Sequence, residues 1–259
     1  MSNPSNSIPA SFLVSASVIT DCGCVRDLNE DCCQVVQPSD PDLLDRKGVL
    51  IIVADGMGGC QAGEVASRIA VETVARAYYA SADEPEVALA AAFHEANGEI
   101  YEFSRGREEL NGMGTTCTAL VIQGRVAHSA HVGDSRLYLV RSNSIYQMTE
   151  DHSVVKELIK QGAITPNAAR HHIDRNIILR ALGSHAAVQV ATWEQPLPVR
   201  PGDQFVLCSD GLHDSVSDEE ILLATESGET SAACESLIAT ARERGADDNI
   251  TVAIARVDG

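Results

Sequence analysis

The chain has few aromatic residues and few basic ones. Aromatic residues make up 4% of its 259 residues, with a single tryptophan, and 19 Lys and Arg stand against 37 Asp and Glu, so the formal net charge is −18 at pH 7. Nucleic acids and anionic membranes bind positively charged surfaces, so this balance speaks against both as partners. Hydrophobic residues still make up 44%, which is enough for a buried core in a chain of this size.

Long hydrophobic runs are also missing. No segment reaches the roughly 18–20 consecutive apolar residues that a membrane-spanning helix needs. Residues 1–10 have no Lys or Arg ahead of an apolar run, so they lack the pattern of a secretory signal. We therefore expect a cytoplasmic protein without a membrane span.

Eight cysteines are present, but their spacing matches no common reactive motif. No two form a C-x-x-C pair, none has an arginine six positions later as in cysteine-dependent phosphatases, and no Walker A sequence occurs. Cysteine-based catalysis and P-loop ATP hydrolysis therefore have no motif behind them. Cys22, Cys24, Cys32 and Cys33 lie close together, which leaves a soft-metal site open beside the commoner role of a small buried hydrophobe.

The order of apolar patterns predicts an α+β domain. Segments rich in β-branched residues and segments with helical periodicity follow one another, and short strands joined by tight turns favour antiparallel pairing. No Pro/Gly/Ser-rich linker divides the chain, so we expect residues 1–10 to be a flexible N-terminus and residues 11–259 to form one domain. We predict strands at 11–20, 48–54, 115–123, 126–132, 137–140, 145–148, 188–193, 204–208 and 249–256, helices at 63–79, 85–103, 151–162, 217–226 and 231–243, a loop at 38–46 and a mobile polar segment at 165–175.

Aspartates recur at the ends of the apolar strand segments. These five are Asp31, Asp55, Asp134, Asp210 and Asp248. A single Asp-Gly pair is most often a simple turn, but strand ends deliver side chains to a common site, so we expect the five carboxylates to converge. Converging carboxylates repel one another unless cations lie between them. A donor set of oxygen atoms alone favours Mg²⁺ or Mn²⁺ over zinc or copper.

Six short motifs in a fixed order carry a resemblance to a known family. They are Arg26-Asp27-Leu28-Asn29-Glu30-Asp31, Val53-Ala54-Asp55-Gly56-Met57-Gly58-Gly59, Gly114-Thr115-Thr116, His131-Val132-Gly133-Asp134-Ser135-Arg136, Ser209-Asp210-Gly211-Leu212 and Asp247-Asp248-Asn249-Ile250-Thr251. Each motif alone is weak, but together they span nearly the whole chain. In this series the chain resembles the metal-dependent type 2C (PPM family) Ser/Thr protein phosphatases in their bacterial form.

The resemblance implies both a fold and a metal centre. The fold is a central antiparallel β-sandwich flanked by pairs of helices, which forms a single catalytic domain. The metal centre holds two Mn²⁺ or Mg²⁺ ions at one end of the sandwich. Asp55 is implied to bridge the two ions, and Gly56 to supply a carbonyl oxygen. Asp210 and Asp248 are implied to hold one ion, and Asp31 the other.

Three further residues gain roles from the same resemblance. Glu30 is implied to act on a metal ion through water, and Asp134 to bind a weaker third ion together with Asp210. Arg26 stands where the family has a phosphate-binding arginine, and a guanidinium can hold two phosphate oxygens at once. The implied reaction is in-line attack on phosphorus by a hydroxide that bridges the two metal ions. Arg26 and Asp55 are thus the predicted catalytic residues.

The resulting prediction is a protein phosphatase that hydrolyses phosphoserine and phosphothreonine and so reverses a Ser/Thr kinase in bacterial signalling. We expect a monomer whose partners are phosphoproteins, a cognate Ser/Thr kinase and the substrates of that kinase. Two alternatives stay open. One is a pseudophosphatase-like regulatory module that binds phosphoproteins without turnover, against which the complete set of acids speaks. The other is a phosphatase of a phosphorylated anti-sigma-factor antagonist.

The chain departs from the family where a histidine is common. Met57 and Cys60 occupy the two positions, after the Asp-Gly pair, where members of the family carry it. The role of general acid then passes to a metal-bound water or to another histidine. The candidate histidines are His152, His171, His172 and His213.

Residues 151–180 resemble the segment that bears a flap in this family. Within it, the polar stretch 165–175, with Arg170 and Arg175, is predicted to contact phosphopeptides. Arg136 is predicted to pair with a nearby acid and not with substrate.

Overall fold

Strand β3 (Val49–Met57) explains why this sequence builds a layered fold. Its side chains alternate between two cores, since Ile52 packs toward a pair of helices while Ile51 and Val53 pack toward a second sheet. A strand buried on both faces belongs in the middle of a stack of layers. The computed structural model describes residues 12–58, 62–110, 112–169, 172–226 and 228–259.

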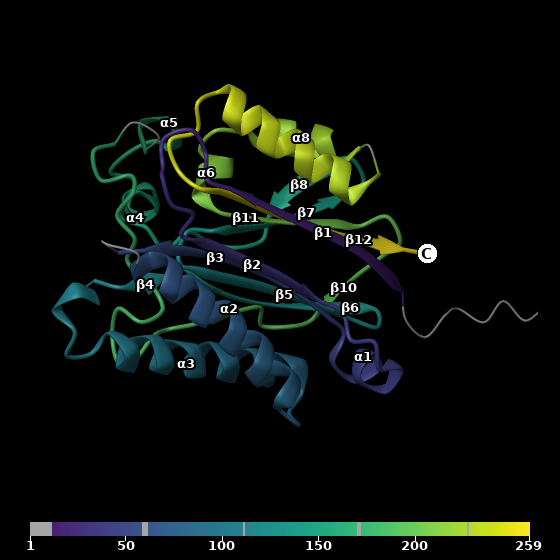
Figure 1. Ribbon diagram of the computed structural model, residues 1–259. Coiled ribbons are helices and arrows are strands. Elements are labelled where there is room, and N and C mark those ends of the chain that lie inside the picture. Colours follow the sequence, from purple (N-terminus) through teal and green to yellow (C-terminus); the bar gives the residue numbers. More distant parts are fainter. Residues whose placement is uncertain (1–11, 59–61, 111, 170–171, 227) are drawn as a thin grey trace, which may run out of the picture.

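Two antiparallel sheets lie face to face (Figure 1). The first has the order β1 (Leu13–Asp21), β12 (Ile250–Asp258), β11 (Gln204–Cys208), β7 (Arg136–Arg141) and β8 (Ser144–Gln147). The second has the order β10 (Leu197–Pro198), β6 (Val126–Val132), β5 (Cys117–Gln123), β3 and β2 (Asp31–Val36), with β4 (Gly114–Thr115) beside β3 and β9 (Ala191–Thr192) beside β6. The core between the sheets includes Leu120, Leu137, Phe205 and Leu207.

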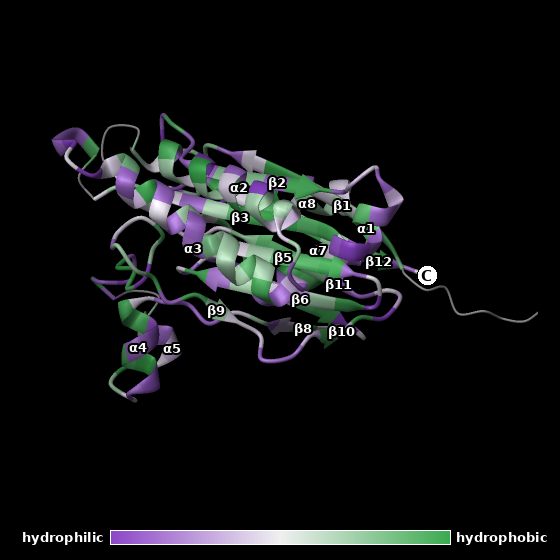
Figure 2. Cartoon of the chain, turned by 90° about the horizontal axis from the view of Figure 1, so that it is seen from below, coloured by the Kyte–Doolittle hydropathy of each residue, from purple (hydrophilic) through white to green (hydrophobic). Residues whose placement is uncertain are grey.

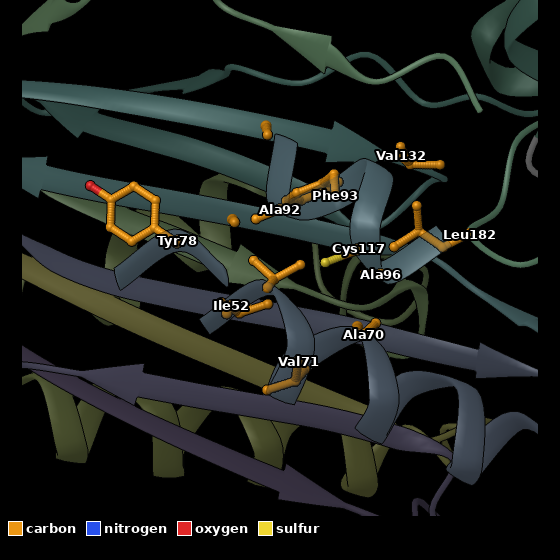
Figure 3. Packing of buried hydrophobic residues seen from close by; sticks show 14 of the residues in the cluster. Ile52, Ala70, Val71, Tyr78, Ala92, Phe93, Ala96, Cys117, Val132 and Leu182 are labelled. Carbon is orange, nitrogen blue, oxygen red and sulfur yellow. The ribbon is translucent and has the colours of Figure 1, made fainter. Parts of the chain in front are cut away.

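A pair of helices covers the outer face of each sheet (Figure 1). Helices α2 (Ala62–Ala80) and α3 (Pro85–Ser104) lie on the second sheet, and α7 (Asp218–Thr225) and α8 (Thr230–Glu243) on the first. Figure 3 shows Tyr78 of α2 and Phe93 of α3 among the fully buried side chains between these two helices and the second sheet. The remaining helices are α1 (Pro41–Lys47), the 3₁₀ turn Glu108–Leu110, α4 (Val154–Lys160), α5 (Pro166–Ala169) and α6 (Asp210–His213).

The two ends of the sandwich carry different elements. Figure 1 places α4, α5, α6 and β4 at one end, and α1 and the C-terminus at the other. In Figure 2, α4 and α5 lie beside each other, set apart from the strands. The end with α4 to α6 is where β2 begins and β11 ends, and so it receives the aspartates that the sequence singled out.

The predicted α+β fold with an antiparallel sandwich is confirmed, and two local predictions differ from the structure. Residues 38–46 were expected to form a loop, but α1 occupies most of this segment. The Asp40 side chain accepts a hydrogen bond from the Asp42 amide, and Pro41 stands in the first turn, where its missing N–H costs nothing. A strand was also expected over 188–193, of which only β9 forms. The prediction for residues 1–10 lies outside the described residues.

Candidate metal centre

Two of the aspartates are brought together by strand pairing. Asp31, the first residue of β2, stands directly opposite Asp55 on β3. Asp31 is buried, and its Oδ2 accepts hydrogen bonds from the hydroxyls of Ser209 and Thr251, each at 2.7 Å. Its other oxygen, Oδ1, has no hydrogen-bond partner. One side of this carboxylate is therefore held by the protein while the other is left free.

Asp55 and Gly56 sit where β3 passes very close to α2. The Asp55 amide donates to Thr116 Oγ1 at 2.9 Å, and the Gly56 amide donates to the Glu30 carbonyl at 3.1 Å. A Cβ on Gly56 would lie 2.1 Å from the carbonyl oxygen of Gly63 and 2.5 Å from that of Glu30. Glycine is thus required for this crossing, which holds the Asp55-Gly56 backbone against the Glu30 segment.

Asp134 and Asp210 approach the same end from two other loops. Asp134 lies between β6 and β7, and Asp210 begins α6 directly after β11. Their Oδ1 atoms, like that of Asp31, are buried and lack a hydrogen-bond partner. In the described part of the chain, no other buried side-chain oxygen is left in this way. Buried carboxylates without partners are costly, and oxygen donors of this kind fit hard divalent cations.

The pKa values of these carboxyl groups are shifted chiefly by burial, and those of Asp55 and Asp210 also by neighbouring acids of the set. Burial raises the pKa of Asp31 to about 6, of Asp134 to about 7 and of Asp210 to about 8. Burial, followed by the charges of Asp31 and Asp210, also raises the pKa of Asp55 well above its ordinary value. Each raised pKa means that the fold does not supply enough positive charge to stabilise the ionised carboxylate. Divalent cations would supply that charge.

The remaining acids lie at the exposed rim of the cluster. Asp248 Oδ2 pairs with Arg26 Nη2 at 2.8 Å, and about half of the Arg26 side chain is exposed. Burial raises the pKa of Glu30, while the charge of Arg26 lowers it. Among the described residues, no three acid, His or Cys side chains are close enough together to hold a metal ion as they stand. The acids share one end of the sandwich without forming a closed ligand shell.

Sequence reasoning missed three residues that organise this end. Ser209 and Thr251 orient Asp31, as described above, although each belongs to a motif other than that of Asp31. The Asn249 side chain accepts from the Glu30 amide at 2.8 Å and donates to the carbonyl oxygen of Leu28 at 2.9 Å. It thereby fastens the loop before β2 to the start of β12. The motifs contain all three residues, but only strand pairing shows what they contact.

A cavity of about 730 Å³ opens beside Asp134 and Asp210. Its lining also includes residues of α4, α5 and the segment after them, among them Lys156 and Arg175. This arrangement places Arg175, predicted to contact phosphopeptides, next to the acid cluster. The predicted pairing of Arg136 with an acid is confirmed, since its guanidinium binds Asp151 at 2.7 Å. Arg170 and Cys60 lie outside the described residues.

The candidate histidines differ in their surroundings. Among those that the structure describes, only His213 lines the cavity, and its Nε2 lies 3.2 Å from the Asp134 carbonyl oxygen. His152 is buried, and burial together with Arg180 lowers its pKa to about 4, so it is a poor proton donor at neutral pH. His172 Nδ1 accepts from the Asp174 amide at 3.2 Å. His171 lies outside the described residues.

The early cysteines are free thiols in this structure. Cys33 and Cys32 alternate along β2, and burial raises the pKa of Cys33 to about 12. Metal ligation needs the thiolate, so this environment favours the role of a small buried hydrophobe for Cys33.

Comparison with known proteins adds independent evidence. A family model described as "Protein phosphatase 2C" matches residues 28–251. The chain belongs to the protein phosphatase 2C family. A curated relative, serine/threonine phosphatase stp of Listeria monocytogenes serotype 4b, is 39% identical over 245 residues, which cover 92% of this chain and 94% of the relative.

Solved structures of the family agree with the fold. The serine/threonine phosphatase Stp1 of Staphylococcus aureus superposes with a TM-score of 0.86 at 31% identity, over 99% of this chain and 100% of the other. The catalytic domain of the phosphatase PstP, in complex with two manganese ions, has a TM-score of 0.82 at 34% identity, over 96% and 100% of the two chains. The predicted family, fold, enzyme class and metal dependence are confirmed, and the alternative of binding without turnover is not favoured.

Proposed function

We propose that this chain removes phosphate from phosphoserine and phosphothreonine in proteins, with residues 11–259 as one catalytic domain. The observation that carries the proposal is the set of buried carboxylate oxygens without partners at Asp31, Asp134 and Asp210. Two Mn²⁺ or Mg²⁺ ions would satisfy these oxygens. The residues assigned to hold the ions are Asp31, Asp55, Gly56, Asp210 and Asp248, with Glu30 acting through water and Asp134 serving a third, weaker ion.

When bound, such ions lower the pKa of water and supply a nucleophile for in-line attack at phosphorus. The protein's own residues position the other reactant. Arg26 is held by one exposed ion pair, which is worth little, so its guanidinium can turn from Asp248 to the phosphate oxygens. Lys156 and Arg175 line the same cavity as Asp134 and Asp210, and their positive charges suit a phosphorylated peptide there. Among the described candidate histidines His213 lines this cavity, which supports it as the candidate proton donor to the leaving group.

The proposal extends to the cellular setting. The substrates are phosphoproteins made by a cognate Ser/Thr kinase, and the enzyme acts as a monomer in the cytoplasm. All seven cysteines among the described residues are free, as is usual in a reducing compartment. No helix in the described ranges is long and apolar enough to cross a membrane.

The test is phosphate release from a phosphothreonine peptide by metal-stripped protein, with and without Mn²⁺. We expect turnover that depends on Mn²⁺ and that an Asp210→Ala variant lacks. A folded wild-type protein that binds Mn²⁺ but releases no phosphate from any phosphopeptide would contradict the proposal.

A further inference from the structure

His152 connects a metal-site loop with the segment that walls the cavity. Its amide donates to the Gly133 carbonyl at 2.7 Å, and its ring Nδ1 accepts from the Gly133 amide at 3.1 Å. Its own carbonyl accepts from the Leu179 amide at 2.7 Å. One buried residue therefore holds the backbone directly before Asp134 and, at the same time, the return of the segment 151–180.

The orientation of the His152 ring is fixed on several sides. The ring packs on His131 with 4.8 Å between ring centroids, and His131 is itself held by Thr118 Oγ1 at 2.9 Å. Because a backbone amide can only donate, the Gly133 contact makes Nδ1 an acceptor, and a neutral ring then carries its proton on Nε2. That nitrogen lies 3.2 Å from Arg180 Nη1, a second donor. A neutral ring has one acceptor nitrogen and so cannot accept from both the Gly133 amide and Arg180. The hydrogen bond from the Gly133 amide to Nδ1 is the one consistent with this tautomer.

Gly133 leaves little room for its loop to move. Its φ is +112°, and a Cβ there would lie 2.5 Å from the side chain of Thr116. Thr116 Oγ1 in turn accepts from the Asp55 amide at 2.9 Å and shares a hydrogen bond with Ser135 Oγ at 2.7 Å. The loop at Gly133 is therefore in close contact with Thr116 on one side and hydrogen-bonded to His152 on the other.

We propose that His152 is a positioning residue: by fixing the Gly133 amide it sets the Asp134 carboxylate toward Asp210, and it ties that carboxylate to the wall of the cavity. The inference rests on the proposed function, because its effect reaches the reaction through the ion assigned to Asp134 and Asp210. It assigns His152 no proton transfer and no contact with substrate. Loss of the Gly133 contact loosens Asp134 and weakens metal binding.

Three substitutions separate the contacts of the ring. His152→Asn places its Oδ1 near the position of Nδ1 and keeps an acceptor for Gly133, His152→Gln places an acceptor near Nε2 instead, and His152→Ala has neither. We measure Mn²⁺ binding to the metal-stripped proteins by calorimetry, and the Mn²⁺ concentration that gives half-maximal phosphate release. We expect the Gln and Ala variants to need about 10–100-fold more Mn²⁺, as when a partner of a metal ligand is lost. The Asn variant stays within about threefold of wild type.

His128 supplies a matched control. His128 is as buried as His152. It lies on β6 and has acidic neighbours at the start of α3. We expect His128→Gln to leave the Mn²⁺ dependence unchanged.

The outcomes separate the inference from the function on which it rests. A wild-type protein without Mn²⁺-dependent turnover contradicts the proposed function. An active wild type with an Asn variant as impaired as the Ala variant, or with a Gln variant that behaves like wild type, overturns the role of His152. If the Ala variant does not fold, the Asn and Gln variants still decide.

Discussion

Strand β11 has an aspartate near each end, and the two differ in their hydrogen-bond partners. Asp203, directly before the strand, is buried and fully paired: Arg141 donates to it at 2.8 and 2.6 Å, and the Arg200 amide donates at 2.7 Å. Asp210, directly after the strand, has a buried oxygen without a partner, and burial raises its pKa to about 8. The same residue type is paired within the fold at one end of the strand and has an unsatisfied carboxylate oxygen at the other.

This difference distinguishes aspartates that stabilise the fold from aspartates that are available to a cation. A buried carboxylate with a guanidinium fork and a backbone donor has its charge neutralised within the fold. A cluster of buried carboxylates without cations destabilises the fold unless protons or metal ions join it. The cluster formed by Asp31, Asp55, Asp134 and Asp210 belongs to the second kind, and so it marks the end of the sandwich where a cation belongs.

The largest effect is expected from Asp210→Asn. The substitution removes a proposed metal ligand together with the repulsion of its charge, so Mn²⁺-dependent phosphatase activity should fall by about a thousandfold or more, equivalent to ~4 kcal/mol. The free energy of unfolding of the metal-stripped protein should stay the same or rise. Activity and denaturant unfolding are measured on the same sample. A variant that loses stability but keeps its activity would reverse the roles assigned to the two ends of β11.

Asp203→Asn should show the opposite pattern. Removing one partner of a buried ion pair leaves Arg141 without its counter-charge, which costs about 3 kcal/mol of stability. For a chain of this size the midpoint of thermal unfolding should fall by roughly 6–12 °C. Activity below the transition should stay within severalfold of wild type, because Asp203 lies at the end of β11 away from the cluster. If the folded Asp203→Asn variant lost its Mn²⁺-dependent activity, the separation of roles between Asp203 and Asp210 would be wrong.

The stability of the metal-stripped protein should fall as the pH rises. In the folded chain Asp31, Asp134 and Asp210 keep protons up to about pH 6, 7 and 8, whereas unfolded aspartates lose them near pH 4. The folded state therefore binds more protons across this window, and its advantage is lost as the pH passes the folded values. We expect the Tm in EDTA to drop by about 10 °C or more from pH 5 to pH 8.

Excess Mn²⁺ should reverse this trend, because metal binding requires the deprotonated carboxylates and stabilises only the folded chain. The Asp210→Asn variant should show a shallower drop in EDTA. A Tm in EDTA that rises from pH 5 to pH 8 would mean that these groups are not held protonated.

The smallest effect is expected from Arg26→Ala. Its pair with Asp248 is exposed, so the substitution should change stability by less than about 1 kcal/mol. The value of kcat/KM for a phosphopeptide should fall by about tenfold, which corresponds to one lost charge-assisted contact with phosphate. Arg68→Ala, which breaks an equally exposed pair with Glu64 on α2, is the control and should leave kcat/KM unchanged.

The sequence predicted the fold, and the structure brings predicted acids such as Asp31 and Asp55 together at one end of the sandwich. What the sequence did not predict has physical causes. Strand ends and motifs pointed to Asp55 and Asp210, but the same strand-end criterion fits Asp203 equally well. The motif series contains Asp210 and leaves out Asp203, and the contact of Asp203 with Arg141, 62 residues away in the chain, gives the physical reason. In the same way α1 was missed because a short polar helix depends on its cap, and the role of His152 depends on the pairing of distant backbone segments.

Calorimetric titration of Mn²⁺ into metal-stripped wild type, Asp203→Asn and Asp210→Asn tests the central claim most directly. Wild type and Asp203→Asn should bind Mn²⁺ with the same stoichiometry and similar affinity, while Asp210→Asn should lose at least one ion or bind it about 100-fold more weakly, a loss of ~3 kcal/mol. Equal Mn²⁺ binding by all three proteins would contradict the account, because the unpaired carboxylates would then not be the metal ligands.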